Sequence, residues 1–199
     1  MSDKITEDEL KVEKTEGFKV GEKKTLDEYL KLDEGDESLK TYKKSLGLSK
    51  GEPLPVDPND KRTCVILSLA LESEGRPDIV VDCSQPGQLE NLKKNPFTIK
   101  EGATFRMKVR YRVQGDIISG LKYVQVVKRM GITQKSQEMI GSYAPNTKEQ
   151  PFYEKKFEPD EAPSGMMARG DYTAVSRFID DDDKEHLRFE WAFKIKKDW

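Results

Sequence analysis

Residues 104–113 read Thr-Phe-Arg-Met-Lys-Val-Arg-Tyr-Arg-Val, and this stretch decides the fold class. Apolar side chains occupy every second position from Phe105 to Val113, and Arg or Lys fills the positions between them. A period of two places the two sets on opposite faces of an extended chain. The stretch therefore predicts a half-buried β-strand with a strongly basic outer face.

The same alternation recurs through residues 61–199. It is clearest in 187–195, where Leu, Phe, Trp, Phe and Ile alternate with Arg, Glu, Ala and Lys, and it is present in 67–71. Further β-like runs separated by turn residues cover 78–83, 97–100, 121–127 and 172–179. Many short strands without a long helix between them predict an all-β fold, specifically an antiparallel immunoglobulin-like β-sandwich.

Residues 1–60 have a different composition and are predicted to form a flexible arm. They carry 11 Lys and 16 Asp or Glu, a net charge of −5, whereas residues 61–199 carry a net charge of +3. Residues 1–24 have few large apolar side chains, so burial cannot offset the entropy of ordering, and disorder is expected. The Pro-rich stretch 51–58 predicts an extended linker.

Within the arm, residues of about 25–47 predict a helical hairpin. Thr25 and Glu28 have the spacing of a capping box, Asp36 is a second candidate N-cap, and Gly47 is placed to end the second helix. Each helix is shorter than the roughly 12–15 residues that an isolated helix needs. From the pattern alone, two interpretations stay open: the hairpin packs on its own domain, or it orders only on a partner.

Several functional classes find no support in the sequence. The charged N-terminus predicts no secretory signal, and no apolar run is long enough to span a bilayer, so we expect a cytoplasmic protein. Cys64 and Cys83 are expected to be reduced thiols, without a zinc pattern. The modest charge balance does not favour nucleic acid. His186 and the run Asp180–Asp183 are interpreted as a solvated turn, and neither a catalytic site nor a metal or cofactor site is predicted.

A set of separate motifs, in one order along the chain, carries a resemblance to a known family. They are Asp36-Glu37-Ser38-Leu39 with Tyr42, Ile118–Tyr123, Glu161–Gly170 with its Ala-Pro-Ser-Gly-Met-Met core, Ser176-Arg177-Phe178, and the closing Lys196–Trp199. From about residue 25 to the end, the chain closely resembles the Rho GDP-dissociation inhibitors. The resemblance implies a protein that binds prenylated Rho-family GTPases, preferably in their GDP-bound form, slows release of GDP and extracts the GTPases from membranes without inserting stably itself.

The resemblance also assigns expected roles to individual residues. It implies that the arm hairpin meets the GTPase switch regions, through Asp36, Ser38, Leu39 and Tyr42, and that Asp182 lies near the same partner. It implies that the sandwich holds the geranylgeranyl group between its sheets. The residues expected to line this pocket by matching position are Phe97, Ile117, Ala174, Phe189 and Trp191, with Leu69 or Leu71, whose register stays open. Without the resemblance, every one of these pocket residues is interpreted as ordinary core. The alternative function is a general carrier of prenylated or acylated proteins that does not affect nucleotide exchange.

Overall fold

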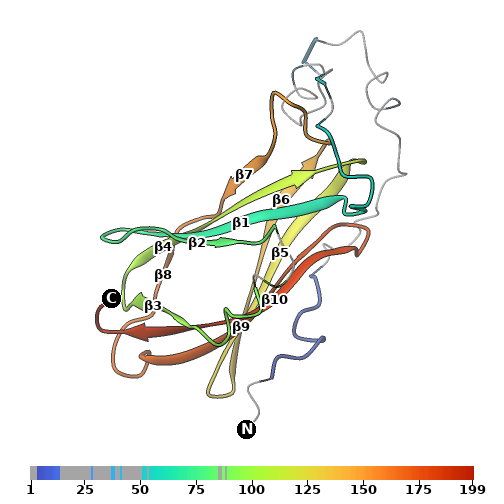
Figure 1. Cartoon of the computed structure of the whole chain (residues 1–199). Coiled ribbons are helices and arrows are strands. Elements are labelled where there is room, and N and C mark those ends of the chain that lie inside the picture. Colours follow the sequence, from blue (N-terminus) through green and yellow to red (C-terminus); the bar gives the residue numbers. More distant parts are fainter. Residues whose placement is uncertain are drawn as a thin grey trace.

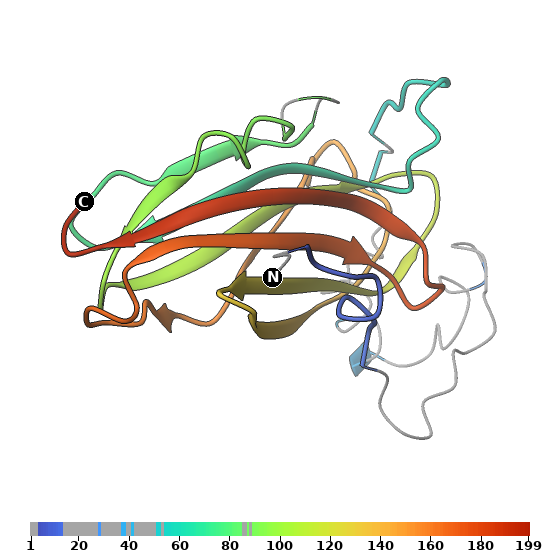
Figure 2. The same cartoon turned by 90° about the horizontal axis from the view of Figure 1, so that it is seen from below.

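The computed structural model describes residues 4–13, 28, 37, 38, 41, 51, 52, 54–84, 87 and 89–199. Its strands are β1 (Cys64–Ser73), β2 (Ile79–Asp82), β3 (Phe97–Lys100), β4 (Thr104–Val113), β5 (Ile118–Arg129), β6 (Ile132–Tyr143), β7 (Tyr153–Lys156), β8 (Asp160–Glu161), β9 (Gly170–Ile179) and β10 (Glu185–Lys196). They form two layers packed face to face (Figures 1 and 2). The predicted β-sandwich is therefore confirmed.

Each sheet has its own strand order. The first, the β1 sheet, has the order β2-β1-β4-β7, with β8 also pairing with β4, and the second, the β10 sheet, has the order β3-β10-β9-β5-β6. All pairings in these sheets are antiparallel except that of β3 with β10, which is parallel. The prediction located most strands but missed β6, β7 and β8.

The alternation in β4 works as the sequence predicts. Val109, Tyr111 and Val113 are buried between the sheets at 0–1% exposure. On the outer face, Lys108 pairs with Glu72 of β1 at 2.5 Å and Arg110 pairs with Glu154 of β7 at 2.7 Å. The basic face is thus a ladder of cross-strand ion pairs, of the kind that stabilises a sheet locally.

The sandwich has two ends, which we name by their turns. At the β9–β10 end lie the turn Asp180–Lys184 and the connection between β4 and β5 (residues 114–117). At the β5–β6 end lie the turn Met130-Gly131, the connection 101–103 between β3 and β4, and the loop 162–169 before β9. The strand registers fix this arrangement, because Ser73 pairs with Phe105 at one end of the β1 sheet and Cys64 with Val113 at the other.

The residues at positions 4–13, here the N-terminal segment, lie on the outer face of the β10 sheet (Figure 2). Ile5 and Leu10 pack against Val126 and Val175, and Leu10 has no exposed surface. The disorder predicted for residues 1–24 is therefore wrong for this segment. The prediction failed because two buried apolar side chains, Ile5 and Leu10, are too few to build a core, although they are enough to cover two valines on an existing sheet.

Polar contacts fix the N-terminal segment in register. Glu9 accepts hydrogen bonds from the Thr6 backbone N–H at 2.7 Å and the Thr133 hydroxyl at 2.9 Å, and these contacts lower the pKa of Glu9 to about 2. Lys128 reaches Glu9 at 3.2 Å. The side chain of Gln137 completes the set, accepting from the backbone N–H of Glu13 at 3.0 Å and donating to its carbonyl at 3.1 Å.

Most of the arm hairpin lies outside the described residues, including Asp36, Leu39 and Tyr42. Glu28, Glu37, Ser38 and Thr41 are described and are helical, and the Thr41 hydroxyl donates to the Glu37 carbonyl one turn earlier at 3.1 Å. The linker, apart from Pro53, runs beside residues 146–148, where Leu54 N–H donates to the Asn146 carbonyl at 3.2 Å.

Candidate functional site

An apolar cavity opens between the two sheets, in the half of the sandwich toward the β5–β6 end. Two cross-strand rows of the β1 sheet form one wall: Val81–Leu69–Val109 and Ile79–Leu71–Met107. All but Val109 line the cavity. These rows exist because β1, β2 and β4 all alternate, so their apolar positions coincide across three strands.

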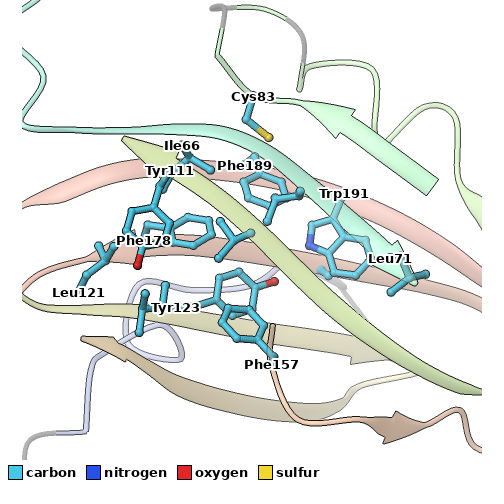
Figure 3. Close-up of a cluster of buried hydrophobic side chains, with 14 of the residues drawn as sticks. Ile66, Leu71, Cys83, Tyr111, Leu121, Tyr123, Phe157, Phe178, Phe189 and Trp191 are labelled. Atoms are coloured by element: carbon cyan, nitrogen blue, oxygen red, sulfur yellow. The ribbon is translucent and has the colours of Figure 1, made fainter. Parts of the chain in front are cut away.

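The opposite wall is aromatic. Phe189 and Trp191 of β10 line it together with Phe97 of β3 and Tyr123 of β5, and Leu92 comes from the connection before β3. The Phe97 ring is stacked on Trp191 with centroids 5.5 Å apart. Trp191 is in turn stacked on Phe193 at 5.3 Å. Figure 3 shows Trp191 facing Leu71 across the space between the sheets.

The cavity is narrow. Its volume is about 50 Å³. Leu69, Leu71, Phe189 and Trp191 keep 7–8% of their surface exposed, whereas Val109 beside them keeps none. A long hydrophobic chain can therefore enter only if the two walls move apart.

A small hydrogen-bonded group stands behind the aromatic wall. The Trp191 indole N–H donates to the Ser176 hydroxyl at 2.9 Å, and that hydroxyl also shares a hydrogen bond with the Tyr123 phenol at 2.8 Å. Ser176 has no exposed surface. Burial raises the pKa of Tyr123, so its phenol stays protonated. Because a buried indole N–H needs an acceptor, Ser176 fixes how the Trp191 ring is presented to the cavity.

The structure brings together five of the seven predicted pocket residues: Leu69, Leu71, Phe97, Phe189 and Trp191. Both Leu69 and Leu71 line the cavity, so the geometry does not favour one over the other, and their contact with a lipid stays a prediction. Ala174 pairs with Trp191 in the adjacent strand and is 2% exposed, outside the lining.

Ile117 lies in the connection between β4 and β5, at the β9–β10 end, and is not part of this lining either. Its predicted contact with a lipid stays a prediction.

Several lining residues were not predicted. They are Ala70, Ile79, Val81, Leu92, Met107 and Tyr123. The alternation of 78–83 and 104–113 contains the signal for Ile79, Val81 and Met107, because residues that alternate in phase on neighbouring strands must share one face.

Asp182 lies at the opposite end, exposed in the turn between β9 and β10. Its neighbour Asp180 holds this turn together: the Asp180 carboxylate accepts from the Asp182 and Lys184 backbone N–H groups at 3.0 and 2.9 Å. It also contacts His186 Nε2 at 2.8 Å, and both of these side chains are almost completely buried.

Burial alone would raise the pKa of Asp180. The hydrogen bonds from His186 and from the backbone N–H groups together have the larger, opposite effect, so the pKa lies below its usual value. The interpretation of His186 and the whole aspartate run as a solvated turn is therefore wrong for His186 and Asp180. Asp181 is also partly buried, and it pairs with Lys122. The sequence did not indicate that Asp180 pairs with His186 or that Asp181 pairs with Lys122.

An apolar cavity between the layers, with few polar groups around it, defines a β-sandwich of the kind that binds a hydrophobic ligand. The family model for RHO protein GDP dissociation inhibitor matches residues 3–198. The chain therefore belongs to the Rho GDP-dissociation inhibitor family, as its sequence motifs indicate.

Named relatives agree with this family. The chain is 48% identical to the Rho GDP-dissociation inhibitor of Schizosaccharomyces pombe, a match that covers 90% of this chain and 86% of the relative. It is 46% identical to that of Saccharomyces cerevisiae, covering 90% of both chains. It is 41% identical to human Rho GDP-dissociation inhibitor 1, covering 92% of this chain and 86% of the relative.

Proposed function

We propose that this protein binds prenylated Rho-family GTPases in their GDP-bound form, slows release of GDP, and carries the GTPases from membranes into the cytoplasm. The observation that carries the proposal is membership of the Rho GDP-dissociation inhibitor family across residues 3–198. The GTPase is the partner, and the geranylgeranyl group is the lipid taken up by the cavity.

The cavity supports the lipid part of the proposal. Each buried CH₂ of a membrane anchor contributes about 0.8 kcal/mol, so a soluble carrier must offer the isoprenoid a similarly apolar environment. Leu69, Leu71, Phe97, Phe189 and Trp191 provide such surfaces, and Ala174 and Ile117 are proposed to join them when the walls part.

The acidic arm supports the nucleotide part. Asp36, Ser38, Leu39 and Tyr42 are proposed to contact the switch regions, and Asp182 to contact the GTPase from the β9–β10 end. The net charge of −5 on residues 1–60 favours approach of the basic segment that adjoins a prenylated tail, chiefly as a salt-sensitive effect on association.

A general carrier of prenylated or acylated proteins is the weaker hypothesis. Such a carrier needs the cavity but has no need of the predicted arm hairpin, and the family is one of GDP-dissociation inhibitors. None of the helices within the described residues is long and apolar enough to cross a membrane.

The test combines two assays on the full chain. Rho GTPases, prenylated and unprenylated, are loaded with fluorescent GDP, and its release is followed with and without this protein. The prenylated form is also bound to liposomes, and the fraction released into solution is measured. Slower GDP release together with extraction of the prenylated form supports the proposal. Extraction with unchanged GDP release would instead support the carrier, and no extraction would reject both.

A pair of arm variants locates the inhibitory contact. Tyr42→Ala should restore fast GDP release while leaving uptake of a prenylated peptide unchanged. Phe18→Ala is the matched control, because it removes an arm aromatic outside the predicted hairpin. Equal effects of the two variants would reject the assigned role of Tyr42.

A further inference from the structure

Four large apolar side chains are exposed at the β5–β6 end of the sandwich. Met130 and Ile132 are 78% and 75% exposed, and Met166 and Met167 are 83% and 86% exposed. We call these four residues the methionine tips. They occupy two neighbouring turns: Met130 lies between β5 and β6, and Met166-Met167 are the central residues of a turn closed by a hydrogen bond from Ala168 N–H to the Gly165 carbonyl at 3.0 Å.

A side chain of β5 holds the two turns against each other. The Arg129 guanidinium donates to the backbone carbonyls of Met167 and Arg169. It also donates to the Tyr172 hydroxyl at 3.2 Å and lies over the Tyr172 ring at 4.9 Å. The methionine tips therefore form one surface.

The second turn is also fixed from below. Glu101, in the connection between β3 and β4, accepts from Arg169 through both carboxylate oxygens at 2.7 and 2.9 Å and from the Gly165 backbone N–H at 3.0 Å. The Arg169 hydrogen bonds are the main cause of the lowered pKa of Glu101. Bidentate pairs of this kind impose a fixed geometry. Met166 and Met167 are thus held outward by a specific scaffold.

The backbone at Met130 is unfavourable for methionine. Met130 and Gly131 have φ values of 48° and 80°, the geometry of a two-residue hairpin turn of type I′. Asn, Asp or Gly is the usual first residue of this turn, because other side chains are strained in the left-handed region. A strained position that carries a long apolar side chain into solvent indicates a functional use rather than a structural one.

The shape of this surface fits a bilayer better than a protein. A stable protein interface uses roughly 20–30 residues on each side, whereas the methionine tips are four side chains on two convex turns. Unbranched, polarisable Met side chains adapt to irregular apolar surroundings, and apolar side chains inserted at a membrane interface bind reversibly.

We propose that the methionine tips dock this protein on the surface of a lipid bilayer. This inference rests on the proposed function and deepens it. The cavity lies in the same half of the sandwich, bounded by Leu71 and Met107 near this end. Docking through the tips brings the cavity close to the membrane from which an isoprenoid must leave, while the β9–β10 end stays free for the GTPase.

The experiment uses the full chain without any GTPase and neutral phosphatidylcholine liposomes, with co-flotation as the measurement. Met166→Ser/Met167→Ser should lower the bound fraction at least tenfold. Met130→Asn should lower it several-fold while raising the thermal midpoint, because Asn suits the turn that strains Met. The matched control is Met139→Ser, which removes a 53% exposed methionine from β6 far from this end and should change nothing.

Three outcomes overturn the inference. The first is equal binding by wild type and the tip variants, and the second is equal loss in Met139→Ser. The third is binding that appears only with anionic lipid, disappears with salt and ignores the methionine changes. Uptake of a soluble geranylgeranylated peptide is measured beside flotation. If the wild type takes up the peptide but the tip variants float as the wild type does, only the docking inference is rejected. If the wild type does not take up the peptide, the proposed function itself is rejected.

Discussion

The interior of the sandwich has two halves that are both rich in aromatic rings but are built differently. Toward the β9–β10 end, Tyr111 of β4 and Tyr153 of β7 meet Tyr143 of β6, so the rings cross from one sheet to the other. Their planes are inclined by 36–74°. We call this the closed half.

In the open half, which holds the cavity, the largest group of rings belongs to one sheet. Phe97, Trp191, Phe193 and Tyr172 form a stack with interplanar angles of 10–30° along the inner face of the β10 sheet. The facing β1 sheet lines the cavity with aliphatic side chains and Met107. One ring contact crosses between the layers here, from Phe157 after β7 to Tyr123 of β5, with centroids 5.3 Å apart. Three rings that cross between the sheets interlock them, whereas a stack along one sheet gives the other sheet more freedom to move away. The comparison is the reason why we propose the lipid site in the open half.

The largest expected effect separates the halves by stability. Leu121 belongs to the closed half and has no exposed surface, whereas Leu71 lines the cavity at 8% exposure (Figure 3). Leu121→Ala should lower the free energy of unfolding by about 3 kcal/mol. Leu71→Ala should cost less, about 2 kcal/mol, because a side chain that already lines a space has fewer packing contacts to lose. Urea unfolding measures both, and equal costs would contradict the division into halves.

The second prediction fills the open half. Ile79→Trp places a large side chain in the cavity and should weaken binding of a geranylgeranylated peptide at least tenfold, about 1.4 kcal/mol. Val80→Trp is the matched control, since Val80 is the next residue of β2, points outward and is 64% exposed. Fluorescence titration measures both affinities. Unchanged binding by Ile79→Trp would place the lipid elsewhere.

The third prediction concerns the hydrogen bonds behind the ring stack. Ser176→Ala leaves the Trp191 indole N–H buried without its acceptor, which should cost about 1–2 kcal/mol. The Trp191 emission should also change when it is measured in a Trp199→Phe background, because the ring is no longer held in place. Val175→Ala, on the other face of the same strand, serves as the control and should leave the emission unchanged.

The smallest effect is kinetic and uses the two thiols, one in each half. Burial raises the pKa of both Cys64 and Cys83 to about 12. Because only the thiolate reacts, labelling of either thiol should be slow at pH 8 and accelerate roughly tenfold per pH unit up to that value. Cys83 is 5% exposed whereas Cys64 has no exposed surface, so Cys83 should react faster than Cys64 and be protected by the prenylated peptide. Mass spectrometry of the labelled peptides compares the two rates, and faster reaction of Cys64 would contradict the assignment.

The fold was predictable where one face of a strand is buried. β4 and β10 can be recognised in the sequence because apolar residues alternate with other residues along most of their length. β6 does not, because most of its residues are polar on both faces and it lies at a sheet edge. The packing of the N-terminal segment could not be predicted either, since its two buried apolar residues contact Val126 and Val175, which are more than a hundred positions away in the sequence.

The candidate site was predictable in part. Resemblance to the family supplied Phe97, Phe189 and Trp191, and alternation on neighbouring strands contains the signal for Ile79 and Met107. Neither source indicates that the rings stack along a single sheet, because that depends on rotamers and on contacts between strands far apart in the chain. The buried contact between His186 and Asp180 was not predicted for the same reason.

The docking of the N-terminal segment limits the reach of the arm. Glu13 is fixed to β6 through its hydrogen bond with Gln137. At the other end of the arm, the Glu52 carbonyl accepts a hydrogen bond from the Lys148 backbone N–H at 3.0 Å. The chain between them is therefore tied to the sandwich at both ends, and this limits the distance from the sandwich that any residue between them can reach. A ligand-binding stretch within such a loop has a high effective concentration at the sandwich surface. Release of residues 4–13 would turn the loop into a tail with a longer reach and a lower effective concentration.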